Sequence, residues 1–206
     1  MSSSMQVELE SNKIFGIGIS RTGTTSLGVA LLYLGIPTTH YVTRPELYHD
    51  ARAILDAPVF ADFERLDHQF PRSRFIYTQR DPDAWLHSFR DKLLDGPMNQ
   101  REETRRPQHE AAVMNQRVYR DLFGRIDGLS DDVLREGYLR HRERVFGYFL
   151  GRPNDLLVLT IDEEDNQTMW SRLCEFVGIR IPGAFPVFPN QTARLWDQIH
   201  HPCKVT

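Results

Sequence analysis

Apolar runs alternate with segments of helical periodicity along most of the chain. Continuous apolar or β-branched runs, typical of strands buried on both faces of a parallel sheet, occur at 13–19, 36–42, 57–63, 73–79 and 155–161. Between them, apolar spacing predicts helices over 24–35, 44–56, 81–94 and 166–178. This alternation predicts an α/β fold of three layers, α/β/α, around a mainly parallel five-stranded sheet with right-handed crossovers.

The middle of the chain breaks the alternation. Residues 96–109 are strongly polar and contain two prolines, which predicts an exposed loop or a lid, and two amphipathic helices are expected at 113–126 and 131–150. We therefore expect a single domain over residues 1–206, with a polar loop and a helical insertion at about 96–150. The tail from Pro182 onward keeps Phe185, Phe188 and Trp196, which predicts that it packs against the domain.

Composition narrows the classes of function. The 206 residues carry a formal net charge of −3, so a phosphorylated ligand needs a local site and nucleic acid is not an expected partner. Two cysteines are too few for a disulfide framework or a metal cluster, and the N-terminal segment lacks the apolar core of a signal peptide. No segment has the roughly 18 apolar residues that span a bilayer. We expect a cytoplasmic protein without a membrane span, and the oligomeric state stays open.

The first predicted strand and helix are joined by a glycine-rich loop, "FGIGISRTGTTSL" at 15–27. Such a loop brings backbone N–H groups and the positive end of the helix dipole to an anion, while Gly18 and Gly23 allow a close approach. Arg21 adds a permanent charge with a fork of donors. In ATP-binding Walker loops a lysine follows the second glycine, but here Thr24 stands there. The loop therefore predicts a phosphate site of another kind, the alternative being a plain strand-to-helix turn.

A second motif, "RDPDAWLHS", follows the fourth predicted strand. Arg80 leaves the strand, Pro82 is suited to a helix start, and Ser88 lies eight residues after the arginine. Eight residues bring Ser88 back near Arg80 across about two helical turns, so that both side chains could hold one phosphate. Alternatively, Arg80 pairs with Asp81 or Asp83 and Ser88 has no role.

In this order, "SRTGTTSL" and "RDPDAWLHS" resemble the two nucleotide-binding motifs of the sulfotransferase family, in its compact branch, with similarity over roughly 13–195. The resemblance implies a fold of the P-loop NTPase type and the co-substrate PAPS (3′-phosphoadenosine 5′-phosphosulfate), with PAP (adenosine 3′,5′-bisphosphate) as product. It implies that Arg80 and Ser88 bind the 3′-phosphate. It also implies that the 5′-phosphosulfate is held by Arg21, Thr22, Gly23, Thr24, Thr25 and Ser26. The Arg-Lys-Gly and Lys-Thr-His segments of the larger enzymes are missing, so the remaining 3′-phosphate ligands are unidentified.

Sulfuryl transfer to a hydroxyl or an amine needs a base for the acceptor's proton and a cation for the departing phosphate, but no metal. Arg21 suits the second task. For the base, Asp62 is expected at the carboxyl end of the predicted strand 57–63, where ligands collect in open α/β sheets, although it could equally be a helix cap or an ion-pair partner. Glu64 and His40 are the other candidates.

Two alternatives stay open. The run "LLVLTIDEE" imitates a Walker B strand that ends in Asp162 and Glu163, and Thr25 could then bind Mg²⁺ in a P-loop kinase or NTPase. The chain could also be a non-catalytic nucleotide-binding protein of the same fold. The acceptor, a small molecule or a glycan, is not identified by any segment.

Overall fold

A five-stranded parallel sheet forms the middle layer of the computed structural model, which describes residues 12–42, 44–94, 109–125, 127–180 and 196–206. The strand order is β2-β3-β1-β4-β5, and every pair in it is parallel, which confirms the predicted fold class. The strands are β1 (Ile14–Gly16), β2 (Thr38–His40), β3 (Ala53–Leu55), β4 (Arg74–Gln79) and β5 (Leu156–Thr160).

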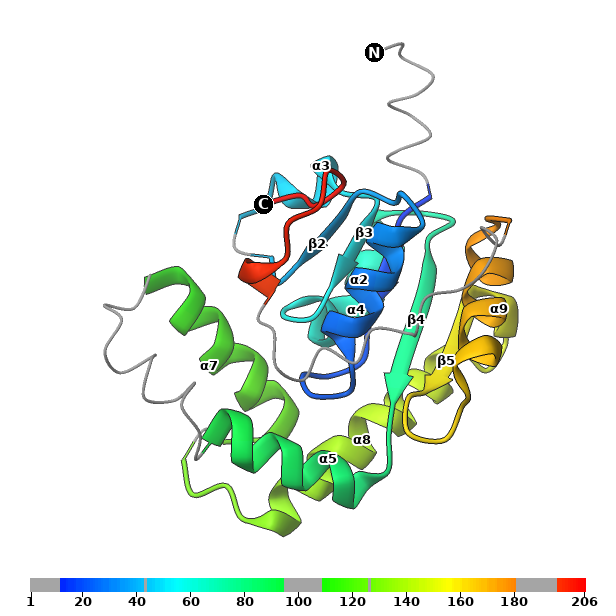
Figure 1. Ribbon diagram of the computed structural model, residues 1–206. Helices are drawn as coiled ribbons and strands as arrows, with labels where there is room; N and C mark the ends of the chain where they lie inside the picture. The colour runs from blue at the N-terminus through cyan, green and yellow to red at the C-terminus, as the bar shows by residue number, and fades with distance from the viewer. Residues whose placement is uncertain (1–11, 43, 95–108, 126, 181–195) are drawn as a thin grey trace.

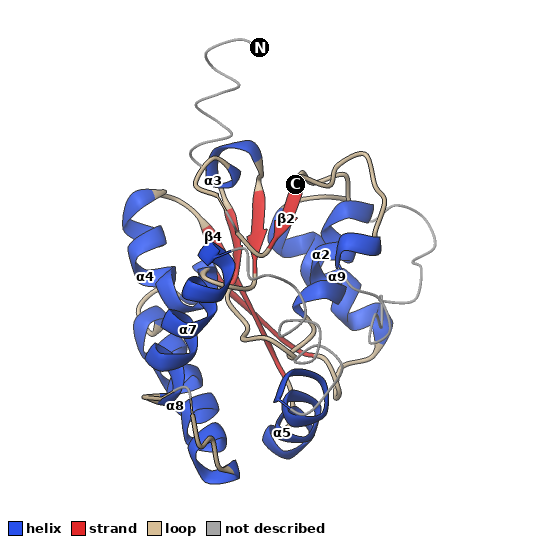
Figure 2. Ribbon diagram, turned by 90° about the vertical axis from the view of Figure 1, so that its left-hand side faces the viewer, coloured by secondary structure: helices blue, strands red, loops and turns tan. Residues whose placement is uncertain are grey.

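Helices cover both faces of the sheet (Figures 1 and 2). One face carries α2 and α9, and the opposite face carries α4, α7 and α8. The helices are α2 (Thr24–Tyr33), α3 (Leu47–Asp50), α4 (Val59–Gln69), α5 (Pro82–Phe89), α7 (His109–Phe123), α8 (Asp131–Phe149) and α9 (Asn166–Val177). Shorter helical turns are η1 (Arg90–Leu94), η2 (Pro153–Asp155) and η3 (Trp196–Gln198).

The core is divided between the two faces by the alternation of side chains along the strands. On β1, Phe15 belongs to the cluster under α4 and α8, whereas Ile14 belongs to the cluster under α2 and α9. Strands buried on both faces need apolar residues at nearly every position, which is why the continuous runs predicted four of the five strands. Trp85 and Trp170 are fully buried in these two clusters.

Two predicted elements between residues 44 and 63 were wrong. The run 57–63 is not a strand but includes the start of helix α4, which buries Val59, Phe60, Phe63 and Leu66 on one side. This spacing is the helical period, and the short length of the run concealed it. Conversely, the helix predicted over 44–56 is limited to α3, and its last part contains the three-residue strand β3.

The predicted helices α5 and α9 are present, and their ends carry the expected caps. The carboxylate of Asp81 accepts the backbone N–H groups of Asp83 and Ala84 at 2.9 Å, and Pro82 occupies the first turn of α5. Helix α9 begins in the same way, where Asp165 accepts from the Thr168 N–H, and it ends at Gly178, whose φ of 73° suits a glycine.

Parts of the chain lie outside the described residues, among them most of the polar loop predicted at 96–109 and the tail between Pro182 and Leu195. The end of the tail does pack back, as predicted. The Thr38 N–H donates to the Cys203 carbonyl and the Val205 N–H donates to the Thr38 carbonyl, both at 2.9 Å, so residues near the C-terminus pair with the edge strand β2. No helix in the described part of the chain combines the length and the apolar character that crossing a bilayer requires.

His141 is a buried polar group that links helix α8 to the sheet. Its Nε2 donates to the Ile17 carbonyl at 2.9 Å, directly after β1, and the aromatic rings of Phe60, Phe63 and Tyr77 surround it. Burial lowers the pKa of His141 to about 4, so the imidazole is neutral at pH 7. A buried, neutral histidine makes the stability of the fold depend on pH.

Because the pKa of His141 is lower in the folded than in the unfolded chain, the unfolded chain binds the extra proton first as the pH falls below about 6.5. We expect the unfolding free energy to fall by about 2 kcal/mol between pH 7 and pH 5 because of this residue. Urea unfolding at both pH values measures the loss, which should shrink by that amount in His141→Gln. The exposed histidine variant His87→Gln should keep the full pH dependence, and an unchanged loss in His141→Gln would contradict the assignment.

Candidate functional site

The loop between β1 and α2 has the backbone of an anion-binding turn. Gly23 lies in the left-handed region at φ 90°, and Arg21 does so at φ 75°, which a residue other than glycine rarely adopts. Helix α2 starts at Thr24, so its first N–H groups and the positive end of its dipole are directed toward the loop. The predicted strand–loop–helix arrangement is present.

Side chains from three neighbouring elements hold this loop from inside the protein. His141 of α8 donates to the Ile17 carbonyl, and the Trp85 indole of α5 donates to the Ser20 carbonyl at 3.0 Å. The Thr22 hydroxyl is fully buried, donates to the Ile19 carbonyl at 2.7 Å and lies 3.0 Å from the Thr78 hydroxyl of β4. Among the predicted phosphate ligands, the Thr22 hydroxyl therefore has a structural partner within the loop itself.

The two predicted motifs meet at one point. The Arg21 Nε donates to the Ser88 hydroxyl at 3.2 Å, although 67 residues separate them in the chain. Burial lowers the pKa of Arg21, and the positive charge of Arg80 lowers it further. Two cations held close together repel each other, and an anion bound between them relieves this repulsion.

Arg80 is only partly neutralised. Its Nε lies 3.6 Å from a carboxylate oxygen of Asp162, beyond hydrogen-bond distance, and this buried atom has no hydrogen-bond partner among the described residues. Asp81 and Asp83, the alternative partners that the sequence left open, are engaged elsewhere, since Asp81 caps α5 and Asp83 pairs with Arg135. An orphaned guanidinium nitrogen beside a second arginine fits a phosphate ligand.

Asp56 is the centre of a second polar group, at the carboxyl end of β3. One carboxylate oxygen accepts from the Ser20 hydroxyl at 2.9 Å, while the other accepts from the Thr24 hydroxyl at 3.2 Å and lies 3.3 Å from His40 Nε2. In the described part of the chain, no third acidic, histidine or cysteine side chain joins the pair into a metal site. Asp56 thus connects the glycine loop to the imidazole at the end of β2.

His40 lies beside the first turn of α2 and under the C-terminal segment. Its Nε2 is 3.2 Å from the Thr24 hydroxyl and 3.4 Å from the Thr25 hydroxyl, and its ring stacks on Trp196 with centroids 5.2 Å apart. Lys204 holds the tryptophan by donating to its carbonyl at 2.9 Å. Burial lowers the pKa of His40 more than the Asp56 charge raises it, so the imidazole is neutral at pH 7.

The structure removes the premise on which Asp62 was predicted as the base. Asp62 does not end a strand but lies in the first turn of α4, where Arg117 and Arg65 donate to its carboxylate at distances from 2.9 to 3.1 Å. Although burial raises the pKa of Asp62, these two arginines lower it below its usual value. A carboxylate held ionised in this way is a weak proton acceptor. Glu64 is similarly paired with Arg144 at 2.9 Å.

The strand that resembles a Walker B strand does not lie where a P-loop kinase requires it. The strand before Asp162 is β5, an edge strand separated from β1 by β4, and Asp162 accepts from the Asp81 N–H. The acidic residue next to the loop is Asp56, because β3 pairs directly with β1. Asp56 was not among the residues predicted from the sequence, where its signal was the triplet "AIL" before an aspartate, within a predicted helix.

Comparison with known proteins agrees with the resemblance of the two motifs. A family model described as "Sulfotransferase domain" matches residues 43–194, which is most of the chain. That range includes Asp56, Arg80 and Ser88 and begins after the glycine loop. The chain is also similar to the Ava biosynthesis cluster protein M of Aspergillus versicolor, with 26% identity over a stretch that covers 40% of this chain and 43% of the relative. The match thus spans less than half of that relative's length.

The glycine loop should tolerate no side chain at residue 18. A Cβ added to Gly18 would lie 2.1 Å from the Thr78 hydroxyl oxygen and 2.5 Å from the Thr78 carbonyl oxygen. A small movement of either oxygen would not remove this clash. We expect Gly18→Ala to lower the unfolding free energy by about 1–3 kcal/mol. Gly147→Ala on α8, where an added Cβ meets nothing within 4 Å, is the matched control in urea unfolding. Equal stabilities of the two variants would contradict the close approach at Gly18.

Proposed function

Because the chain belongs to the sulfotransferase domain family, we propose that it transfers a sulfuryl group from PAPS to a hydroxyl or an amine of an acceptor. In this reaction the bond between sulfur and the 5′-phosphate oxygen breaks, a bond between sulfur and the acceptor atom forms, and the acceptor's proton passes to a base. The protein must hold PAPS at two anionic groups, neutralise the departing phosphate and supply the base.

The contact between Arg21 and Ser88 is the observation that carries this proposal. It joins the end of the glycine loop to helix α5, and Arg80, with its orphaned Nε, lies in the same neighbourhood. In the proposed complex Arg80 and Ser88 bind the 3′-phosphate. The 5′-phosphosulfate lies against Arg21, Gly23, the first N–H groups of α2 and the half-buried side chains of Thr25 and Ser26.

Arg21 is suited to the charge that develops on the departing 5′-phosphate. A guanidinium that is already fixed beside the loop need not reorganise when the bond to sulfur breaks, and a preorganised cation in a partly buried site stabilises charge better than a solvated one. The left-handed backbone at Arg21 supports this assignment, since an arginine occupies a conformation that favours glycine.

The proton acceptor that we propose is the pair of His40 and Asp56. The two groups lie 3.3 Å apart, beside the hydroxyls of Thr24 and Thr25 on the first turn of α2, where the sulfuryl group would be transferred. The neutral imidazole can accept a proton, and the carboxylate stabilises the imidazolium that forms. Arginines pair with Asp62 and Glu64 on α4, so neither residue serves as the base in the proposed reaction.

One observation favours a second candidate, a P-loop kinase or NTPase. An acidic residue, Asp56, ends the strand next to the loop and accepts from the Thr24 hydroxyl, one residue before Thr25, the hydroxyl that would bind Mg²⁺ in an NTPase. Against it stands the missing lysine, because Thr24 carries no charge for the β- and γ-phosphates. ATP binding that requires magnesium, together with no affinity for PAP, would favour this candidate. PAP binding without turnover would leave a nucleotide-binding protein.

The acceptor that we propose is a small molecule. The printed name of the Aspergillus relative refers to a biosynthesis cluster, and a small-molecule acceptor agrees with that setting better than a glycan does. Turnover of labelled PAPS with a panel of phenols, alcohols and amines is the corresponding assay.

Removal of Arg80 should weaken binding of the 3′-phosphate and leave binding of the 5′-phosphosulfate intact. We expect Arg80→Ala to lower the affinity for PAP about 10- to 100-fold, since a charge-assisted hydrogen bond contributes about 1.5–3 kcal/mol to binding. Adenosine 5′-phosphosulfate lacks the 3′-phosphate, so its affinity should change little. Calorimetry without magnesium measures the affinities of both ligands, and Arg135→Ala, which removes a half-buried arginine on α8, is the control. Equal losses for the two ligands would remove Arg80 from the 3′-phosphate site.

Substitution of the proposed base should lower turnover and leave binding intact. We expect His40→Gln and Asp56→Asn to reduce kcat by about 10²- to 10⁴-fold, with PAP affinity within a few-fold of wild type. Because the base must be unprotonated and the pKa of His40 is lowered, kcat/KM should rise with pH, and the midpoint of the rise should lie below pH 6.5. Asp62→Asn should keep its activity, and the reverse pattern, with Asp62→Asn inactive and Asp56→Asn active, would overturn the assignment.

A further inference from the structure

The C-terminal segment 196–206 lies against His40, one member of the proposed base pair. The segment begins with the turn η3 and then runs beside the edge strand β2, where its backbone pairs with Thr38 (Figure 1). The indole of Trp196 stacks on the imidazole of His40, with the ring centroids 5.2 Å apart and 24° between the two planes. The side chain of His40 is only 9% exposed, and this indole is one of the groups that cover it.

Trp196 is itself fixed at two points. The Lys204 Nζ donates to the Trp196 carbonyl at 2.9 Å and to the Ile199 carbonyl at 3.0 Å, and it lies 5.3 Å from the centre of the indole. The indole also lies against Gly28 of α2, where an added Cβ would be 2.8 Å from a ring carbon. The segment thus closes around its own lysine, and the indole has a defined place between α2 and the imidazole.

Gly28 gives a second, independent indication that this contact is a built feature of the fold. The residue lies inside α2, where glycine is less favourable than alanine, and its backbone is not in the left-handed region that would require a glycine. Space is what requires it, because a Cβ would also lie 3.1 Å from a methyl group of Leu55. The closer of the two contacts is the one with the indole of Trp196.

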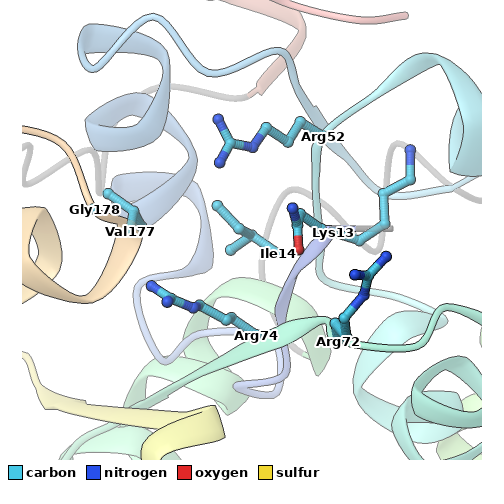
Figure 3. A pocket seen from close by; sticks show the side chains of 8 residues that line it. Lys13, Ile14, Arg52, Arg72, Arg74, Val177 and Gly178 are labelled. Carbon is cyan, nitrogen blue, oxygen red and sulfur yellow. The ribbon is translucent and has the colours of Figure 1, made fainter. Parts of the chain in front are cut away.

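The cavity shown in Figure 3 lies at the opposite ends of the strands from this contact. It has a volume of about 170 Å³ and is lined by Ile14, Arg52 and Arg74, at or directly before the amino ends of β1, β3 and β4. His40, in contrast, is the last residue of β2. A ligand in that cavity would not touch the imidazole, so the surroundings of His40 are those that α2, Asp56 and the C-terminal segment provide.

We propose that Trp196 is a positioning residue for the base, a role that rests on the proposed function. The stacked indole fixes the plane of the imidazole, so that Nε2 of His40 stays 3.3 Å from the Asp56 carboxylate and 3.2 Å from the Thr24 hydroxyl. Without the indole, the imidazole can turn about its side-chain bonds and lose this alignment. Proton transfer depends on such alignment, because the base must lie within hydrogen-bond reach of the acceptor's proton.

The groups that surround His40 give the sign of the change that removal of the indole would cause. Burial lowers the pKa of His40, Asp56 and Asp197 raise it, and Lys204 lowers it. Trp196→Ala admits water to the ring, which lessens the largest of these effects and so raises the pKa. The carbonyl of residue 196 that Lys204 binds remains in this variant, so the charges of the segment keep their places.

Titration of the histidines by NMR tests the proposal without any turnover. The His40 resonance is identified by its loss in His40→Gln. We expect the pKa of His40 to rise toward its ordinary value in Trp196→Ala and also in Gly28→Ala, where the added Cβ displaces the indole. Trp196→Phe keeps a ring on the imidazole and should titrate close to wild type. His200→Ala, which removes an exposed residue of the same segment, is the control. An unchanged pKa in both Trp196→Ala and Gly28→Ala would overturn the proposal.

Kinetics with PAPS test the consequence for the reaction. We expect Trp196→Ala to lower kcat about 10- to 100-fold, with PAP affinity within a few-fold of wild type, and Trp196→Phe to restore most of kcat. The midpoint of kcat/KM against pH should move up together with the pKa of His40. A loss of PAP affinity as large as the loss of kcat would place Trp196 in the nucleotide site and overturn the proposal. If the wild-type chain transferred no sulfuryl group, the proposed function would fail, and the NMR titration would still decide whether Trp196 holds His40.

Discussion

The polar backbone of the glycine loop must find hydrogen-bond partners inside the protein, and the rest of the site depends on this constraint. The loop leaves the central strand of a sheet that helices cover on both faces, so water cannot satisfy the carbonyls that point inward. His141 and Trp85 supply donors to Ile17 and Ser20, and Asp56 accepts from two hydroxyls of the loop and its helix. Each of these side chains comes from a different element, so the loop holds its shape only when the whole sheet and its helices are assembled.

A loop that the interior holds in this way is preorganised for an anion on its outer side. The Thr22 hydroxyl, although it belongs to the motif, faces inward and stabilises the turn. Arg21 faces the other way, toward Ser88 and Arg80, and the two arginines are kept near each other by the fold. Like charges in this arrangement are unfavourable without a ligand, and the stability of the surrounding hydrogen bonds offsets their repulsion.

The sequence predicted the parts of this site whose signals are local. Strand, loop, cap and helix start follow one another within a few residues around Arg21 and around Arg80, so both motifs could be placed before the fold was known. Asp56 could not be found in this way, because three apolar residues are too few to separate a strand from a helix. The roles of His141 and Trp85 depend on which helix covers which face of the sheet, and that is settled by packing rather than by local pattern.

The position of Asp56 explains why the site can do without a lysine after the second glycine. A lysine in place of Thr24 would lie against the Asp56 carboxylate, would hold it ionised and would keep a proton from the neighbouring imidazole. With the cation at Arg21 instead, the charge proposed to bind the anion is separate from the pair proposed to accept a proton. Asp62 illustrates the opposite case, since two arginines stabilise its charge and leave it a weak base. The proposed sulfuryl transfer requires both a cation and a base, and the groups proposed for these two roles lie on different sides of the loop.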